Sequence, residues 1–186
     1  IFNKKNNDIN FYNSGPYPAL FLDRDGVILK EQDHLSDPCR VELKKGIKNL
    51  MEYFTERKIP IIVVTNQSGI ANQKYNWKDY ENVTNKMLFL LGKKVSISAI
   101  YANSEDRNSE NFIWRKPSPK MILLAKEELN LNLEKSILIG DRNSDLEAGL
   151  NANIKHLIHL KTGHGKKERE FIIKNFRNIS KKKIKL

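Results

Sequence analysis

Short apolar runs that alternate with amphipathic segments constrain the fold of this chain more than any other feature. The apolar runs have strand length and cover residues 19–23, 59–65, 95–101, 136–141 and 154–160. The segments between them carry apolar residues at helical spacing and cover residues 46–58, 79–94, 118–129 and 144–150. Strands that alternate with helices predict an α/β fold, in which a doubly wound, mostly parallel sheet is covered by helices on both faces.

The length and composition predict a single folded domain with an extension at each end. A chain of 186 residues with 39% hydrophobic residues suits one compact domain with a sizeable core. The Asn-rich opening is punctuated by Gly and Pro, which indicates an N-terminal extension over residues 1–16. We expect the domain to cover residues 17–165 and a basic C-terminal helix or tail to cover residues 166–186.

The positive charge and the single cysteine narrow the choice of partners. Residues 166–186 hold nine Lys or Arg and two Glu, which is +7 of the net charge of +11. A terminal lysine run is more typical of a solvated tail than of a nucleic-acid groove. The apolar runs are too short to cross a bilayer, the first residues contain no signal-peptide h-region, and Cys39 has no partner cysteine. We expect a cytoplasmic monomer without a nucleic-acid or membrane partner.

Polar residues gather where the predicted strands end. Asp23 and Asp25 follow the first strand, residues 65–68 follow the second, Asp141 follows the fourth, and residues 115–116 precede a helix. Taken singly, these residues are explained as turn formers, helix caps or solvated side chains. Together they place carboxylates, hydroxyl and amide donors, and cations at the edge of an α/β sheet where ligands bind. This combination suits a phosphate ester and Mg²⁺, with a carboxylate as nucleophile.

Four ordered motifs resemble those of the haloacid dehalogenase (HAD) superfamily of phosphohydrolases. They are "FLDRDGVI", "VVTNQSGIA", "RKPSPKMI" and "IGDRNSDLEAG", and the resemblance covers residues 18–165. More narrowly, the motifs are similar to the branch that contains D-glycero-D-manno-heptose 1,7-bisphosphate phosphatases and histidinol-phosphate phosphatases. The resemblance implies a HAD-like domain without a large cap.

The same resemblance implies the roles of individual residues. Asp23 is expected to act as the nucleophile and Asp25 as the general acid and base, while Thr65 and Lys116 stabilise the transferring phosphoryl group. Mg²⁺ is expected at Asp23, Asp25 and Asp141, and Asp145 is given a supporting or helix-terminal role. The residues expected to contact the substrate are Glu31, Gln32, Asp33, His34, Asn66, Gln67, Ser68, Arg115 and Arg142.

One loop departs from the pattern of this branch. Many members bind a structural zinc ion before "RKP" through three cysteines and a histidine, whereas residues 101–116 contain neither residue type. We therefore expect no structural zinc, and a loop held by packing of Phe112 and Trp114 or by polar bonds. His156 and His159 do not replace that site, because residues three apart on a strand point to opposite faces.

The expected activity is hydrolysis of a small sugar phosphate through an aspartyl-phosphate. The resemblance implies a heptose 1,7-bisphosphate 7-phosphatase of nucleotide-heptose synthesis, which supplies lipopolysaccharide or capsule. A histidinol phosphate or another sugar phosphate is the nearest alternative substrate. A nucleic-acid 3′-phosphatase is more distant, because it requires a basic groove with stacking aromatic residues. A catalytically silent binding protein is disfavoured because every expected catalytic position is filled.

Overall fold

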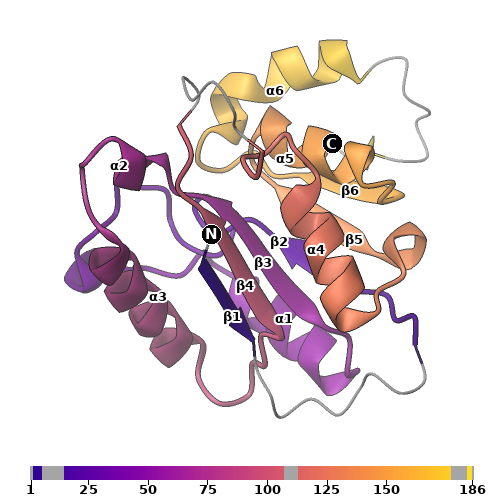
Figure 1. Ribbon diagram of the computed structural model, residues 1–186, viewed down its shortest axis with the longest axis horizontal. Coiled ribbons are helices and arrows are strands. Elements are labelled where there is room, and N and C mark those ends of the chain that lie inside the picture. The colour runs from indigo at the N-terminus through magenta and orange to yellow at the C-terminus, as the bar shows by residue number, and fades with distance from the viewer. Residues whose placement is uncertain (1, 6–14, 107–112, 177–183, 186) are drawn as a thin grey trace.

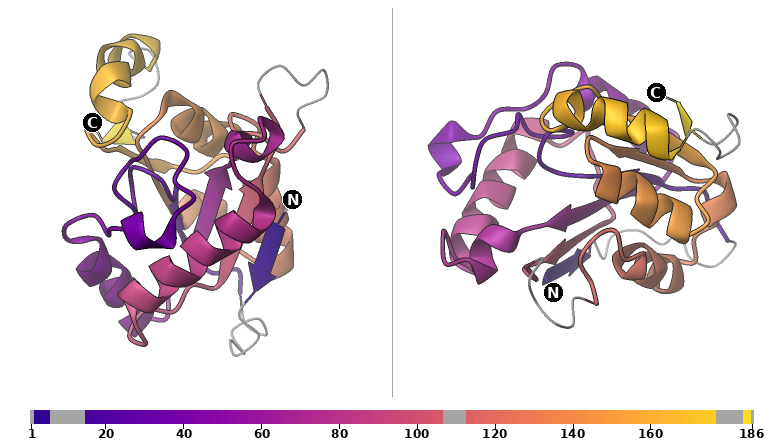
Figure 2. Two further views of the ribbon diagram at one scale, coloured as in Figure 1. Left: turned by 90° about the vertical axis from the view of Figure 1, so that its left-hand side faces the viewer. Right: turned by 90° about the horizontal axis from the view of Figure 1, so that it is seen from above.

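The computed structural model describes residues 2–5, 15–106, 113–176 and 184–185, which form one twisted sheet with helices on both faces (Figures 1 and 2). The seven strands of these residues follow the order β1-β4-β3-β2-β5-β6-β7. All neighbours are parallel except β1, which pairs antiparallel with β4. The strands are β1 (Phe2–Lys5), β2 (Leu20–Leu22), β3 (Ile61–Asn66), β4 (Ala99–Asn103), β5 (Ile137–Gly140), β6 (His156–His159) and β7 (Ile184–Lys185). The predicted α/β fold is confirmed.

Helices from the two halves of the chain cover opposite faces of the sheet. The helices are α1 (Ile47–Glu56), α2 (Ser68–Ala71), α3 (Trp77–Leu91), α4 (Lys120–Leu129), α5 (Asn143–Asn151) and α6 (Gly165–Asn175), with 3-10 turns η1 (Pro38–Arg40) and η2 (Leu133–Lys135). One core lies under α1 and α3, and a second core lies under α4, α5 and α6. In β2, Leu20 and Leu22 join the first core while Phe21 joins the second, as the alternation of side chains along a strand requires.

The register of the central strands gathers their carboxyl ends at one edge. Leu22 of β2 pairs with Val63 of β3 on one side and with Ile139 of β5 on the other. The residues that follow these pairs therefore emerge side by side, as expected for a ligand site in an open α/β sheet.

Two segments differ in position from the sequence prediction. The third predicted strand, at residues 95–101, lies instead at Ala99–Asn103 as β4. Residues 92–98 are used to return the chain from α3 to the sheet, where the Ser98 amide donates to the Ile61 carbonyl at 2.8 Å. In addition, Phe2–Lys5, placed in the N-terminal extension, form the edge strand β1. Within the described part of the chain, no helix combines the length and apolar character needed to span a bilayer.

Candidate active site

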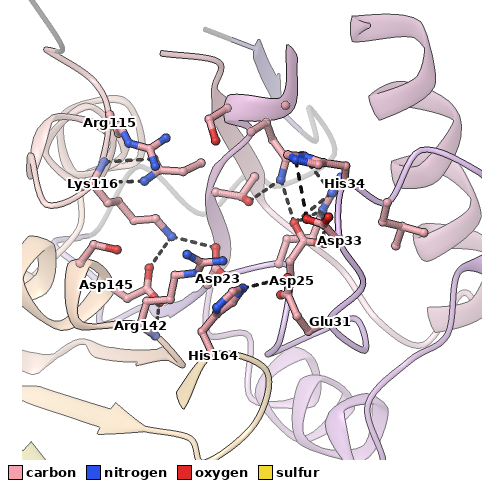
Figure 3. A pocket seen from close by; sticks show the side chains of 18 of the residues that line it. Asp23, Asp25, Glu31, Asp33, His34, Arg115, Lys116, Arg142, Asp145 and His164 are labelled. Carbon is pink, nitrogen blue, oxygen red and sulfur yellow. Dashed lines mark hydrogen bonds and ion pairs between the residues drawn. The ribbon is translucent and has the colours of Figure 1, made fainter. Parts of the chain in front are cut away.

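A pocket of about 440 Å³ opens at the carboxyl ends of β2 and β3, beside the start of α5 (Figure 3). This volume lies within the range of roughly 300–1,000 Å³ that small-molecule sites occupy. Thirteen of the predicted site residues line it, namely Asp23, Asp25, Glu31, Gln32, Asp33, His34, Thr65, Asn66, Gln67, Ser68, Arg115, Lys116 and Arg142. Asp141 does not line the pocket, because it is completely buried behind it.

A buried lysine between two aspartates forms the centre of the site. The Lys116 ammonium lies 2.7 Å from Asp23 Oδ1 and 2.6 Å from Asp145 Oδ1, and it donates to the Val64 carbonyl at 2.8 Å. The Lys116 side chain is 2% exposed. A buried cation is stable only when it is paired, and these three acceptors provide the pairing. The two carboxylates raise the pKa of Lys116 against the lowering effect of its burial, so Lys116 carries a positive charge.

Asn66 fixes the backbone that carries Lys116. Its side-chain amide donates to the Lys116 carbonyl at 3.1 Å, and its side-chain oxygen accepts from the Lys116 amide at 3.0 Å. The two bonds tie the end of β3 to the loop before α4, which is distant in the sequence. Asn66 therefore orients Lys116 toward Asp23, a task that the sequence analysis did not assign to it.

Three carboxylates converge beneath the pocket. Asp23, Asp141 and Asp145 each offer an oxygen, and these oxygens lie within 4.8 Å of one another. Burial raises the pKa of Asp23 to about 7, with Asp145 and Asp25 adding to the rise and Lys116 opposing it. Burial and the charges of Asp23 and Asp145 raise the pKa of Asp141 to about 8. Like charges held this close favour either bound protons or a bound cation.

The carboxylate of Asp141 fits a divalent cation. Its Oδ2 accepts from the His164 amide at 2.8 Å, whereas its Oδ1 is buried without a hydrogen-bond partner in the described structure. Buried carboxylate oxygens are the ligands that Mg²⁺ prefers. Asp145 is less available, since Lys116 and the Arg142 amide contact its oxygens. Asp23 and Asp141 are thus the residues of this cluster best placed to hold an ion.

Two glycines allow the loops around Asp141 to close on it. Gly26 has φ +81° and Gly163 has φ +51°, conformations that residues with a side chain rarely adopt. A Cβ atom at Gly26 would lie 2.4 Å from Asp141 Oδ2, and one at Gly163 would lie 2.3 Å from it. The Thr162 hydroxyl also donates to the Gly26 carbonyl at 2.5 Å. Residues 162–164 therefore hold the loop after β2 in contact with Asp141. The sequence analysis missed this contact.

Acidic and basic side chains line the mouth of the pocket. Burial raises the pKa of Glu31 to about 7, and Asp25 adds to the rise. A ring nitrogen of His164 lies 3.2 Å from Glu31 Oε1, so the segment after β6 also reaches the pocket. His159 lies on β6 with its ring buried, and its Nε2 donates to the Asp141 carbonyl at 3.0 Å, while His156 is exposed on the opposite face.

The loop before Arg115 is closed by a carboxylate. Glu105 Oε2 accepts from the amides of Trp114 and Arg115 at 2.9 and 3.1 Å. The Arg115 guanidinium donates to the Glu105 carbonyl at 2.9 Å, and the Trp114 ring packs partly buried on the core. Packing of Trp114 was predicted as one way to hold this loop, whereas Phe112 lies outside the described residues. Polar bonds were predicted as the alternative, from Asn, Ser and Asp residues, and the bonds above come from Glu105. Glu105 itself was not singled out, because a glutamate among the many polar residues of this loop carries no sequence signal.

The stability of the protein without metal should depend on pH through this cluster. Asp23 and Asp141 have folded pKa values above the unfolded value of 3.8, so the folded state binds more protons between about pH 4 and pH 8. The free energy of unfolding therefore decreases as the pH rises through this window.

We expect the thermal midpoint, measured by circular dichroism with a chelator, to fall from about pH 5 to about pH 8. Added Mg²⁺ should raise the midpoint more at the upper pH, because it binds deprotonated carboxylates. Both effects should shrink in Asp141→Asn. A midpoint at pH 8 that does not respond to Mg²⁺ would contradict cation binding at this cluster.

In this α/β sheet, Asp23 after β2 is paired with the buried Lys116, which is also paired with Asp145 of α5, and such a group suits a class of enzymes that transfer phosphoryl groups to a carboxylate. The model of the haloacid dehalogenase-like hydrolases matches residues 11–158. The chain belongs to this family, and the resemblance seen in its four motifs is confirmed.

Individual relatives fall within one branch of the family. The chain is 39% identical over 140 residues to a D-glycero-β-D-manno-heptose-1,7-bisphosphate 7-phosphatase of Helicobacter pylori, covering 74% of this chain and 80% of that protein. It is 39% identical over 162 residues to a D-glycero-α-D-manno-heptose-1,7-bisphosphate 7-phosphatase of Campylobacter jejuni, covering 87% and 91%. Its fold matches a D,D-heptose 1,7-bisphosphate phosphatase of B. bronchiseptica, crystallised with magnesium and phosphate, at a TM-score of 0.77 and 24% identity, covering 83% and 86%.

Proposed function

We propose that this protein is a Mg²⁺-dependent phosphatase that removes the 7-phosphate of a heptose 1,7-bisphosphate. The observation that carries the proposal is the contact between Asp23 and the buried Lys116 at the base of the pocket. Lys116 neutralises an oxygen of Asp23 and can also neutralise phosphate oxygens placed beside it. The names of the relatives with 39% identity support the choice of substrate.

In the first half of the reaction, a carboxylate oxygen of Asp23 attacks phosphorus. The bond between phosphorus and the sugar oxygen breaks, its electron pair stays on that oxygen, and the oxygen takes the proton of the Asp25 carboxyl group. The product is an aspartyl-phosphate on Asp23 and a free sugar hydroxyl. Thr65 and Lys116 line the same part of the pocket and stabilise the charge of the transferring group.

In the second half, Asp25 works as a base. Its carboxylate takes a proton from water while the water oxygen attacks phosphorus, and the bond from phosphorus to Asp23 breaks. Inorganic phosphate leaves, and both aspartates return to their starting states. Asp23, Asp141 and the Asp25 backbone carbonyl would hold a Mg²⁺ ion, which would supply the positive charge that lets an anionic nucleophile approach an anionic phosphate.

The charges around the pocket suit a substrate with a second phosphate. Arg115 and Arg142 come from different loops and line the pocket together with Lys116 (Figure 3). A single phosphate monoester at Asp23 uses Lys116, and the positive charges of Arg115 and Arg142 suit further anionic oxygens in the same pocket. Glu31 and Asp33 add acceptors that suit sugar hydroxyls.

The test is a phosphate-release assay with and without Mg²⁺. The substrates are the α and β anomers of the heptose bisphosphate, histidinol phosphate, simple sugar phosphates and a 3′-phosphorylated oligonucleotide. The highest kcat/KM is expected for one anomer of the heptose bisphosphate. Both anomers are needed, because the relatives are named for different ones. Faster turnover of another substrate, with negligible turnover of both anomers, would overturn the choice of substrate.

The Glu105 contact should matter for substrate binding. Glu105→Ala removes the acceptor of two loop amides, so we expect the free energy of unfolding to fall by about 1–2 kcal/mol. KM should rise about tenfold because Arg115 loses its fixed position. Urea unfolding and steady-state kinetics measure the two effects, with exposed Glu127→Ala as the control. If Glu105→Ala is destabilised but its KM is unchanged, the Glu105 contact stabilises the loop without affecting substrate binding.

A further inference from the structure

Arg24 stands between the two catalytic aspartates in the sequence, and its side chain is 1% exposed. Its guanidinium faces Asp25: Nε donates to Oδ1 and Oδ2 at 3.2 and 3.1 Å, and Nη2 lies 3.0 Å from Oδ2. Arginine keeps its charge throughout the pH range in which proteins fold. The Asp25 carboxyl group is therefore held against a permanent, buried cation.

Gln67 holds the same carboxyl group from a second side. Its Nε2 donates to Asp25 Oδ2 and to the Thr65 hydroxyl, each at 2.8 Å. Its Oε1 accepts from Arg24 Nη2 at 3.0 Å and from the Tyr75 hydroxyl at 2.6 Å. Because arginine can only donate, the Arg24 bond fixes which end of the Gln67 amide is oxygen. The amide therefore has one orientation, and in it the nitrogen faces Asp25.

Aromatic side chains hold this arrangement in place. The Arg24 guanidinium carbon lies 4.9 Å from the centre of the buried Tyr80 ring of α3, a distance typical of a cation–π contact. Tyr75 comes from the segment between α2 and α3, and Gln67 follows β3. Gln67, Tyr75 and Tyr80 thus come from parts of the fold outside the loop that carries Arg24 and Asp25, and together with Arg24 they restrain the Asp25 side chain. The Asp25 side chain remains 21% exposed, and it lines the pocket.

We propose that Arg24 is a positioning residue which, together with Gln67, fixes the orientation of the Asp25 carboxyl group toward the leaving oxygen of the substrate. Arg24 lines the pocket with only 1% of its side chain exposed, and in this role it acts through Asp25. As Asp25 gives its proton to the sugar oxygen, a carboxylate forms beside the guanidinium, and that cation stabilises the negative charge as it develops. The inference rests on the proposed function, in which Asp25 protonates the leaving group.

The role can be tested through the leaving group. A sugar alkoxide needs the proton of Asp25, whereas 4-nitrophenolate leaves without one. The value of kcat/KM reports the formation of the aspartyl-phosphate. It is not affected by the later hydrolysis of that intermediate, which is the same for both substrates. Arg24→Lys keeps the charge but loses the planar set of donors that contacts Asp25 and Gln67 together. We expect its kcat/KM to fall about a hundredfold on the sugar phosphate and less than about threefold on 4-nitrophenyl phosphate.

Two further variants keep the test interpretable if Arg24→Lys folds poorly. Tyr75→Phe removes one donor to Gln67 and should give the same selective loss, about tenfold in size. Arg57→Lys is the matched control: Arg57 also stacks on a tyrosine, at 3.5 Å from the Tyr53 ring centre, but it caps α1 at the opposite end of the sheet. Its kcat/KM should equal that of the parent on both substrates.

The outcomes separate this inference from the proposed function. Equal losses on the two substrates in both Arg24→Lys and Tyr75→Phe, or no loss in either, would overturn the positioning role while a phosphatase remains. A parent protein that releases phosphate from neither compound, with Mg²⁺ present, would instead overturn the proposed function. A series of aryl phosphates extends the test to leaving phenols of different pKa. A dependence of kcat/KM on that pKa that is steeper in Arg24→Lys than in the parent would support the role of Arg24.

Discussion

Asp23→Asn should release phosphate at least about a thousandfold more slowly than the parent protein, on every substrate that the parent hydrolyses. An amide cannot attack phosphorus as a carboxylate does, and Asp145, the other carboxylate that the described structure places beside Lys116, is not placed to replace it. The oxygens of Asp145 are engaged by Lys116 and by the Arg142 amide, and Asp145 lies in the first turn of α5. The loss should therefore appear in kcat and should not be recovered at high substrate concentration.

The folded state of Asp23→Asn should survive this change. The substitution removes one of three clustered carboxylates whose repulsion and burial raise the pKa of Asp23 and Asp141. Lys116 keeps its contact with Asp145. We expect a thermal midpoint in chelator at about pH 8 no lower than that of the parent, measured by circular dichroism. Phosphate release at the parental rate by this folded variant would show that Asp23 is not the nucleophile.

Lys116→Met should lower both activity and stability. It removes the cation between Asp23 and Asp145, which leaves two buried carboxylates without their partner, a change that costs about 3–5 kcal/mol in other buried ion pairs. The decrease in the free energy of unfolding should be smaller at low pH, because the two carboxylates can bind protons there. The value of kcat should fall about a hundredfold to a thousandfold, because one donor to the phosphoryl oxygens is lost.

The control for this change is an exposed lysine in a similar pair. Lys155 lies 3.0 Å from Glu134, and their side chains are 54% and 69% exposed. Lys155→Met should change the free energy of unfolding by less than about 1 kcal/mol. Urea unfolding at two pH values compares the variants. If Lys116→Met is no less stable than Lys155→Met at neutral pH, the central ion pair does not stabilise the folded state.

Local patterns were sufficient to predict the sheet and its helices. Residues 61–64 of β3 are apolar on both faces, and α1 has an apolar stripe, so both signals lie within a few residues of sequence. The predicted strand began at residue 95 and ended at residue 101, whereas β4 covers Ala99–Asn103, because Val95 and Ile97 have strand-like side chains but serve the return from α3. The edge strand β1 carries no such signal, since its polar residues depend on pairing with β4.

The candidate site also has a part that the sequence predicts and a part that it does not. Asp23, Thr65, Lys116 and Asp141 stand at strand ends or beside a helix, so the topology alone brings them together. The contacts that orient them join residues far apart in the chain: Asn66 with Lys116, Gln67 with Asp25, and Thr162 with Gly26. Such pairs leave no periodic trace in one sequence. The motifs suggest the roles of these residues, whereas the bonds that support them are seen only in the folded structure.

Gly26 and Gly163 pack against Asp141, and this packing restricts which loops around the pocket can vary in sequence. A side chain on either glycine would displace the Asp141 carboxylate, so the loops after β2 and β6 must vary together or not at all. Residues 32–35 also line the pocket, and the loop closed by Glu105 leads directly into Arg115 and Lys116, which line it as well. Descendants of such a gene that acquire new substrates should diverge in these outer loops first, while the reaction itself is inherited unchanged.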